Sequence, residues 1–155
     1  MDGVLDDFDK HADELELWRE DIHKIDWKKL NAIGSKFWAE IEPFDNGLYL
    51  YHKLLELCQE RGISLKILSA GPGAKCRFGK IEWLTKYCPE IPVENVIIKN
   101  KGIEKAQEAS PDSILIDDVG KNIITFKEAG GNVFHYKNNP DECIDYCRSL
   151  LKNIF

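Results

Sequence analysis

The sequence lacks the features that mark several classes of protein. It has no run of about 18 apolar residues, which a membrane-spanning helix requires, and its acidic start does not resemble a signal peptide. The five cysteines form no Cys-x-x-Cys pair and are odd in number, so a disulfide framework or a zinc site is not expected. We therefore expect a cytoplasmic protein with reduced cysteines.

Basic residues are also scarce. Lysine and arginine total 21 against 27 aspartates and glutamates, which gives a net charge of −6. Tight binding to a nucleic-acid polymer requires concentrated positive charge, so this partner is not expected, and a 3'-phosphatase acting on nucleic-acid ends is a weaker hypothesis. A small anionic substrate stays compatible because a bound cation reverses the local field.

Strand and helix patterns alternate along most of the 155 residues. The four short apolar runs that predict buried parallel strands are Leu65–Leu68, Val96–Ile98, Ile114–Ile116 and Val133–Tyr136. The predicted helices are Tyr49–Arg61 with Gly62 as C-cap, Phe78–Tyr87, Lys121–Ala129, and a last one from Asn139 with Ile144, Cys147, Leu151 and Ile154 on one face. This alternation predicts a single α/β domain with a doubly wound sheet over residues 1–155.

The segment from Phe8 to Phe44 interrupts the alternation. It is charged, rich in tryptophan and without a strand pattern. We interpret it as a small helical insertion over about residues 9–44.

After the first, each polar signal stands at or just beyond the carboxyl end of a predicted strand, or on the helix that leads to the next strand. In chain order they are "MDGVLDDF" at the start, "LKILSAGPG" at 65–73, "FGKIEWLTKYCP" at 78–89 and "SILIDDVGKN" at 113–122. Open α/β sheets build their binding sites at this edge.

The order of these motifs resembles the haloacid dehalogenase superfamily. Within it the chain is most similar to the 5'(3')-deoxyribonucleotidases of the cytosolic type C 5'-nucleotidase family, through "DGVLDDF", "FWAEIEPFDNG" and "ILIDD". The resemblance covers nearly the whole chain. It implies a three-layer Rossmann-like core with a helical cap, and a Mg²⁺-dependent phosphomonoesterase that hydrolyses nucleoside monophosphates through an aspartyl-phosphate.

The resemblance also implies a role for each matching residue. Asp2 matches the general acid, whose backbone carbonyl also binds magnesium. Ser69 and Lys80 match the groups that hold the phosphoryl oxygens, Asp117 matches the acidic metal ligand, and Asp118 supports it. The chemistry calls for the same types independently, because phosphoryl transfer gathers negative charge that a hard cation, a lysine and polar donors stabilise.

Each of these residues also has a structural interpretation. The two aspartates of "ILIDD" are compatible with a turn and a helix cap, Ser69 with a strand-end hydroxyl that bonds to backbone, and Lys80 with a solvated helix position. Lys101 and Lys105 are alternatives to Lys80 at the phosphate. The "AGPG" stretch lacks the lysine and spacing of a P-loop, so we predict an ordinary loop there.

The resemblance assigns substrate contacts to Phe8 and Trp38, which would stack on a base, and to Ala70 beside Ser69. The alternative is that Phe8 and Trp38 pack with Trp18, Trp27 and Phe37 in the insertion's own core. The four histidines share no metal-ligand spacing and are interpreted as surface or packing residues.

The resemblance places one further strand and the nucleophilic aspartate ahead of Met1. That strand would lie at the centre of the sheet, between the strand that ends at Ser69 and the one that ends at Asp117. We therefore expect little or no turnover from the chain as written. The alternative is a catalytically silent module that binds a nucleotide or another protein. The oligomeric state is open, and a homodimer is compatible with the sequence.

Overall fold

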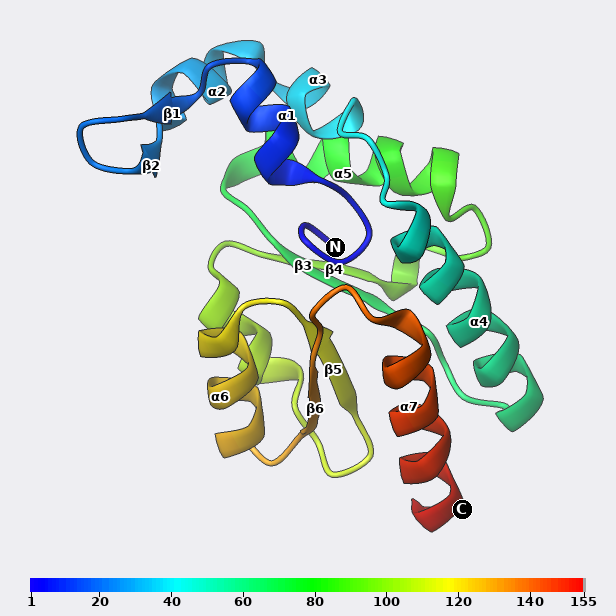
Figure 1. Ribbon diagram of the computed structural model, residues 1–155. Helices are drawn as coiled ribbons and strands as arrows, with labels where there is room; N and C mark the ends of the chain where they lie inside the picture. The colour runs from blue at the N-terminus through cyan, green and yellow to red at the C-terminus, as the bar shows by residue number, and fades with distance from the viewer. Residues whose placement is uncertain (155) are drawn as a thin grey trace.

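The computed structural model describes residues 1–154, with residues 153 and 154 described by their backbone alone. It is a mixed α/β structure in which the described strands form three separate two-stranded sheets (Figure 1). The α/β class predicted from the sequence is confirmed.

Two of these sheets are parallel and form the centre of the molecule. β3 (Ile67–Ala70) pairs with β4 (Val96–Lys99), and β5 (Ile114–Asp117) pairs with β6 (Asn132–His135). Parallel neighbours need a crossover, which α5 (Gly73–Tyr87) and α6 (Gly120–Glu128) supply. All four strands were predicted, with bounds shifted by one to two residues. α5 begins five residues earlier than predicted because the glycine of "GPG" starts the helix directly after Pro72.

Two long helices lie side by side along one flank of the molecule (Figure 1). α4 (Asp45–Arg61) ends at Gly62, whose left-handed backbone, with φ of 65°, confirms the predicted C-cap. α7 (Pro140–Ile154) buries Ile144, Cys147 and Leu151 on one face, as its periodicity predicted. The side chain of Ile154, predicted for the same face, lies outside the described residues.

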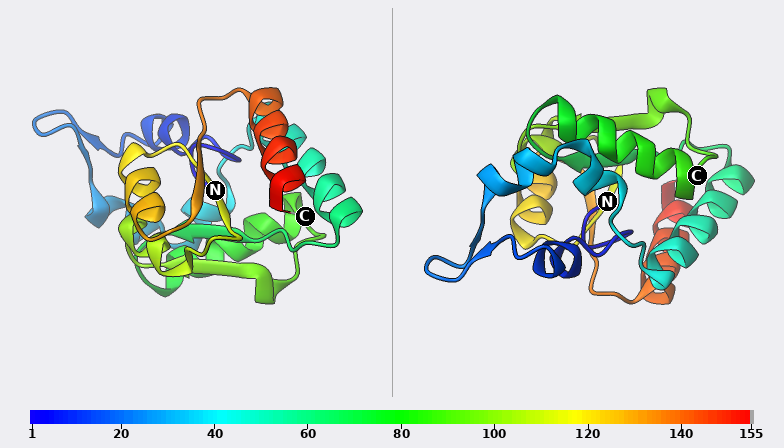
Figure 2. Two further views of the ribbon diagram at one scale, coloured as in Figure 1. Left: turned by 90° about the horizontal axis from the view of Figure 1, so that it is seen from below. Right: turned by 90° about the horizontal axis from the view of Figure 1, so that it is seen from above.

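The insertion is only partly helical. Its elements are α1 (Phe8–Glu14), β1 (Trp18–Arg19), β2 (Lys24–Ile25), α2 (Trp27–Ile33) and α3 (Ser35–Ala39). The prediction of helices is confirmed, but the absence of strands was predicted wrongly, because β1 and β2 form a short antiparallel hairpin. Two residues per strand are too few to show an alternating pattern. Figure 2 shows the hairpin extending away from the rest of the molecule.

A glycine contact fixes the insertion to the body of the molecule. A methyl group built on Gly79 of α5 would overlap the backbone carbonyl of Ser35 and the side chain of Trp38 in α3. Trp83, also in α5, donates its indole N–H to the carbonyl of Ile41 at 2.7 Å. α3 and α5 therefore pack at close range, and the insertion is held over one end of the strands.

The remaining described elements are two 3₁₀ segments, η1 (Val93–Asn95) and η2 (Gly102–Glu108). Within the described residues no helix has both the length and the apolar character that crossing a membrane requires. All five cysteines are buried and free of disulfides, which confirms their interpretation as reduced core residues.

Candidate functional site

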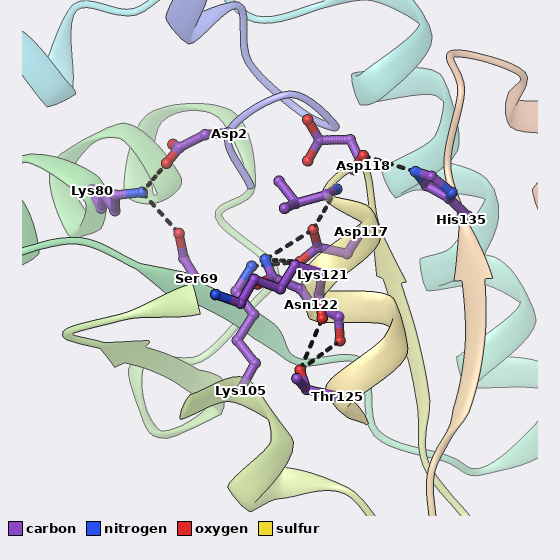
Figure 3. A network of polar contacts seen from close by, with 11 residues as sticks. Asp2, Ser69, Lys80, Lys105, Asp117, Asp118, Lys121, Asn122, Thr125 and His135 are labelled. Atoms are coloured by element: carbon purple, nitrogen blue, oxygen red, sulfur yellow. Dashed lines mark hydrogen bonds and ion pairs between the residues drawn. The ribbon is translucent and has the colours of Figure 1, made fainter. Parts of the chain in front are cut away.

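The site lies where the first residues of the chain meet the carboxyl ends of β3 and β5 (Figure 3). The segment from Met1 to Asp6 forms a compact turn, in which the amide of Leu5 donates to the carbonyl of Met1 at 2.8 Å and the amide of Gly3 donates to the carbonyl of Asp6 at 3.0 Å. Gly3 has φ of 74°, a conformation that favours glycine. This turn directs Asp2 toward α5.

Lys80 joins three of the residues that the sequence assigned to the site. Its side chain is fully buried in α5, and its ammonium group donates to the Asp2 carboxylate at 2.5 Å and to the Ser69 hydroxyl at 2.8 Å. The same ammonium lies 4.8 Å from the ring centre of Trp38, within the range of a cation–π interaction. The structure thus brings Asp2, Ser69 and Lys80 together.

A second buried lysine pairs with Asp117 at the end of β5. The ammonium of Lys105 in η2 lies 2.5 Å from Oδ2 of Asp117. Oδ1 accepts the backbone N–H of Val119 at 2.9 Å, and the Asn122 amide lies 3.2 and 3.3 Å from the two oxygens. Burial opposes ionisation of Asp117, but Lys105 outweighs it, so the pKa of Asp117 is lowered.

These contacts bear on the choice among the three candidate lysines. Lys80 and Lys105 are both buried at the site, each paired with an assigned carboxylate, whereas Lys101 is exposed. The structure therefore leaves two of the three in reach of a ligand at the strand ends.

Asp118 connects the first turn of the chain to β5. A methyl group built on Gly3 would overlap the Asp118 carboxylate, so these two residues are in close contact. Burial and the neighbouring charge of Asp117 raise the pKa of Asp118. His135 of β6 contacts the backbone carbonyl of Asp118 through Nε2 at 2.9 Å. Gly3 of the first turn and Asp118 at the end of β5 are therefore in contact, although they belong to distant segments of the chain.

The site contains buried carboxyl oxygens that accept no hydrogen bond from either of its two lysines. Oδ1 of Asp2 and both carboxyl oxygens of Asp6 are buried without a hydrogen-bond partner. Asp6 is fully buried, and its pKa is raised well above the ordinary value by burial and by the charge of Asp2. A proton held by Asp6, or a cation beside Asp2, would stabilise unpaired acidic groups of this kind.

We tested whether these residues fit the expected magnesium ion. No group of three or more histidine, cysteine or acidic side chains within residues 1–154 is arranged to hold a metal. Mg²⁺, however, often takes only one or two carboxylates and keeps several waters. Asp118, which contacts Gly3 of the first turn, fits that pattern better than Asp117, both of whose oxygens already accept hydrogen bonds. The assignment of Asp2, Asp117 and Asp118 to a metal stays a prediction.

The predicted substrate contacts differ in their exposure. Trp38 is 3% exposed, with Phe8 at 5.6 Å, Phe37 at 5.0 Å and the Lys80 ammonium against its ring. Trp38 thus packs with Phe8 and Phe37 of the insertion, as in the alternative interpretation. Its stacking on a base stays a prediction. Phe8 is half-buried and Ala70 is half-buried at the end of β3, so their assignment stays a prediction.

Sequence reasoning missed two residues that contact the assigned ones. The Asn122 amide donates to both oxygens of Asp117. The only sequence signal for Asn122 was its position five residues after Asp117, at the start of a helix. Asp6 lies next to Asp7 in "DDF", and nothing in the sequence separates the buried residue from its neighbour, which caps α1 by accepting the backbone N–H of Lys10.

Comparison of the chain with protein-family models gave no match, and comparison with curated proteins gave none either. The resemblance to the haloacid dehalogenase superfamily therefore rests on the sequence motifs alone.

Proposed function

We propose that this chain forms the phosphate-binding site of a Mg²⁺-dependent phosphomonoesterase of the haloacid dehalogenase type, with a three-layer Rossmann-like core and the insertion as its cap. The observation that carries the proposal is the pair of buried lysines. Lys80 bridges Asp2 and Ser69, and Lys105 pairs with Asp117, at the shared end of β3 and β5. Two buried ammonium groups beside a hydroxyl suit a dianionic phosphate.

Lys80 and Ser69 would hold the oxygens of the phosphoryl group. The hydrogen bond between them, at 2.8 Å, fixes the direction of both side chains. A phosphate oxygen that enters beside Ser69 replaces the Asp2 carboxylate as the acceptor for Lys80. Because the lysine is already buried and positioned, little reorganisation accompanies binding.

Asp2 would then act as the general acid and base. Its carboxylate is 27% exposed, so it meets both Lys80 and the open side of the site. Release from Lys80 on phosphate binding would let Asp2 take up a proton from solvent, give it to the leaving oxygen and later take one from the attacking water.

Asp118 and the backbone carbonyl of Asp2 would hold the magnesium ion, with the Asp117 network supporting them. The ion would supply charge neutralisation at the phosphoryl oxygens. Asp117 keeps its ionised form through Lys105 and its orientation through Asn122. That arrangement fixes the backbone that carries Asp118.

A carboxylate nucleophile would complete the chemistry, and neither Asp2 nor Asp117 is free to be one in the roles given above. We therefore expect the chain as written to bind a nucleoside monophosphate with little or no hydrolysis. The nucleoside part rests on the motif resemblance and on the half-buried Phe8. A silent nucleotide-binding module is the second candidate, favoured because lysines already hold the carboxylates of both Asp2 and Asp117.

An extended chain separates the two candidates. An apolar strand that ends in aspartate, joined ahead of Met1, should give Mg²⁺-dependent release of phosphate from deoxyribonucleoside monophosphates. The Asp2→Asn variant of that extended chain should bind the nucleotide and release no phosphate. Binding without hydrolysis in the extended parent favours the silent module, and full activity in Asp2→Asn contradicts the role of Asp2.

A further inference from the structure

The insertion exposes apolar side chains on and around the β1–β2 hairpin. Figure 2 shows this hairpin extending away from the rest of the molecule. Five of the eleven large apolar side chains that are exposed within the described residues belong to residues 15–33, namely Leu15, Trp18, Ile22, Trp27 and Ile33. Exposed apolar side chains that gather in one region, tryptophans above all, are typical of a contact surface.

The outer edge of β2 carries free backbone groups. Across the hairpin the backbone N–H of Asp26 donates to the carbonyl of Leu17 at 2.7 Å. Neighbouring residues of a strand direct their N–H and C=O groups to opposite sides, so Ile25 directs both of its groups away from β1. No other strand pairs with β2 in the part of the chain that the structure describes. The edge at Ile25 is therefore open to another strand.

The two faces of the hairpin differ in character. Trp18 of β1 lies directly opposite Ile25 of β2, and residues opposite one another in a strand pair share a face. Lys24 and Asp26, on either side of Ile25, point to the other face. A hairpin with two residues in each strand is marginally stable by itself, so a further strand at its edge would stabilise it.

The charges along β2 complement those of a second copy. When Lys24-Ile25-Asp26 is laid antiparallel to itself and centred on Ile25, each lysine faces an aspartate. Lys24 forms no ion pair among residues 1–154, and Asp26 caps α2 through Oδ1 alone.

The net charge of this region also favours a second copy of the chain. Residues 15–33 hold four basic and four acidic side chains, whereas the whole chain carries −6. Two copies that meet through a neutral region keep their acidic bodies apart, and salt screens the remaining repulsion. A nucleic acid or an anionic membrane would require an excess of basic residues, which this region lacks.

We propose that two copies of this chain pair through the outer edges of their β2 strands, antiparallel about a two-fold axis at Ile25. Ile25 and the partner's Ile25 would exchange both backbone hydrogen bonds. On one face Trp18 and Ile25 of the two copies form a row of four apolar side chains. On the other face Lys24 of each copy pairs with Asp26 of the other. The two hairpins become one four-stranded sheet with the order β1-β2-β2-β1.

Sedimentation equilibrium of the full chain tests the proposal. The contact is smaller than a standard protein interface, so we expect a reversible dimer with a Kd of about 100 μM, measured from about 10 μM to about 1 mM. Ile25→Pro removes the outward N–H and keeps the bonds to β1, and it should raise the Kd by at least about tenfold. The control Phe78→Ala, which truncates an exposed apolar side chain of α5, should leave the Kd unchanged.

A charge exchange tests the register of the two strands. Lys24→Glu and Asp26→Lys each place like charges opposite one another, so each variant alone should dimerise at least about tenfold more weakly. A mixture of the two variants should form a heterodimer with nearly the parent's affinity, because both contacts again join opposite charges. Since Asp26→Lys removes the N-cap of α2, circular dichroism checks its fold. Lys24→Glu against the exposed Lys86→Glu repeats the test with the cap intact.

Three results would overturn the proposal. The first is a chain that stays monomeric at about 1 mM. The second is a dimer that neither Ile25→Pro nor Lys24→Glu weakens, which would place the contact on another face. The third is a mixture of two folded charge variants that associates no better than each does alone. Sedimentation of the monomer with vesicles of anionic lipid would assign the exposed tryptophans to a membrane surface and would also overturn it.

Discussion

The buried ammonium of Lys80 lies 2.5 Å from the Asp2 carboxylate, although 78 positions separate the two residues in the chain. The same group donates to Ser69, so one lysine connects the first turn, the end of β3 and helix α5. Through Lys80, residues from three separate motifs meet in one site.

Replacing Lys80 by methionine should destabilise the fold. The substitution keeps the length of the side chain but leaves Asp2 and Ser69 without their shared donor. Breaking a buried pair costs about 3 to 5 kcal/mol. Since Asp2 is 27% exposed, we expect a smaller loss of unfolding free energy, about 2 kcal/mol. Urea denaturation of Lys80→Met and of the control Lys86→Met, an exposed lysine of the same helix, measures the difference. Equal stability of the two variants would show that the contact is not formed.

Asp6 should make stability depend on pH. Its pKa is raised above the ordinary value of 3.8 by burial and by Asp2, so between these two pKa values the folded state binds the proton more tightly than the unfolded state. The stabilisation present at low pH is therefore lost as pH rises through the folded pKa. In Asp6→Asn this loss disappears, and the variant should exceed the parent in unfolding free energy by at least about 1 kcal/mol at pH 8, with a smaller difference at pH 5.

The control for this prediction is Asp9→Asn, which changes an exposed carboxylate of α1. Its difference from the parent should be the same at both pH values. A parallel pH response of Asp6→Asn and the parent would contradict the buried, proton-binding state of Asp6.

Gly79→Ala tests the fixed position of the insertion. The added methyl group would overlap the Ser35 carbonyl and Trp38, and overpacking of this kind costs about 1 to 3 kcal/mol. Gly120→Ala is the matched control, since its methyl group would make only an ordinary contact at 3.6 Å with His135. Thermal unfolding followed by tryptophan fluorescence should show a lower transition temperature for Gly79→Ala alone. An unchanged transition would mean that α3 does not pack on α5 as described.

The cysteines should resist alkylation in the folded protein. All five are buried, and burial raises the pKa of Cys58 and of Cys76 to about 11 and that of Cys88 to about 12. The thiolate is the reactive form, so intact mass after iodoacetamide treatment at pH 8 should show no modification without urea and modification of all five in urea. Rapid labelling of the folded protein would contradict the burial of these side chains.

The strands and most helices follow from local patterns. Short apolar runs predicted β3 to β6, and Gly62 predicted the end of α4, because an apolar run and a left-handed cap each leave a local signature. The hairpin of the insertion left none, since two residues cannot show a period. The extra turns of α5 depended on a Gly-Pro-Gly start that is more typical of a loop.

The site was predicted from the order of the motifs more than from the physical properties of single residues. Asp2, Ser69, Lys80 and Asp117 were placed together because their motifs, in this order, match the family resemblance. The structure decides two points that the sequence left open. Lys105 pairs with Asp117, and Trp38 lies against Lys80 rather than facing solvent. These contacts depend on how helices pack across the molecule. The sequence around an aromatic residue in a charged segment does not show which face of its ring is covered.

The most direct test of the phosphate site is calorimetric titration of the chain with a deoxyribonucleoside monophosphate, with and without Mg²⁺. We expect binding that requires the ion and that weakens by about tenfold in Ser69→Ala, a substitution that removes one hydrogen bond to the phosphoryl group and changes little else. Absence of binding, or an affinity that neither Mg²⁺ nor Ser69→Ala alters, would contradict a phosphate site at this edge of the strands.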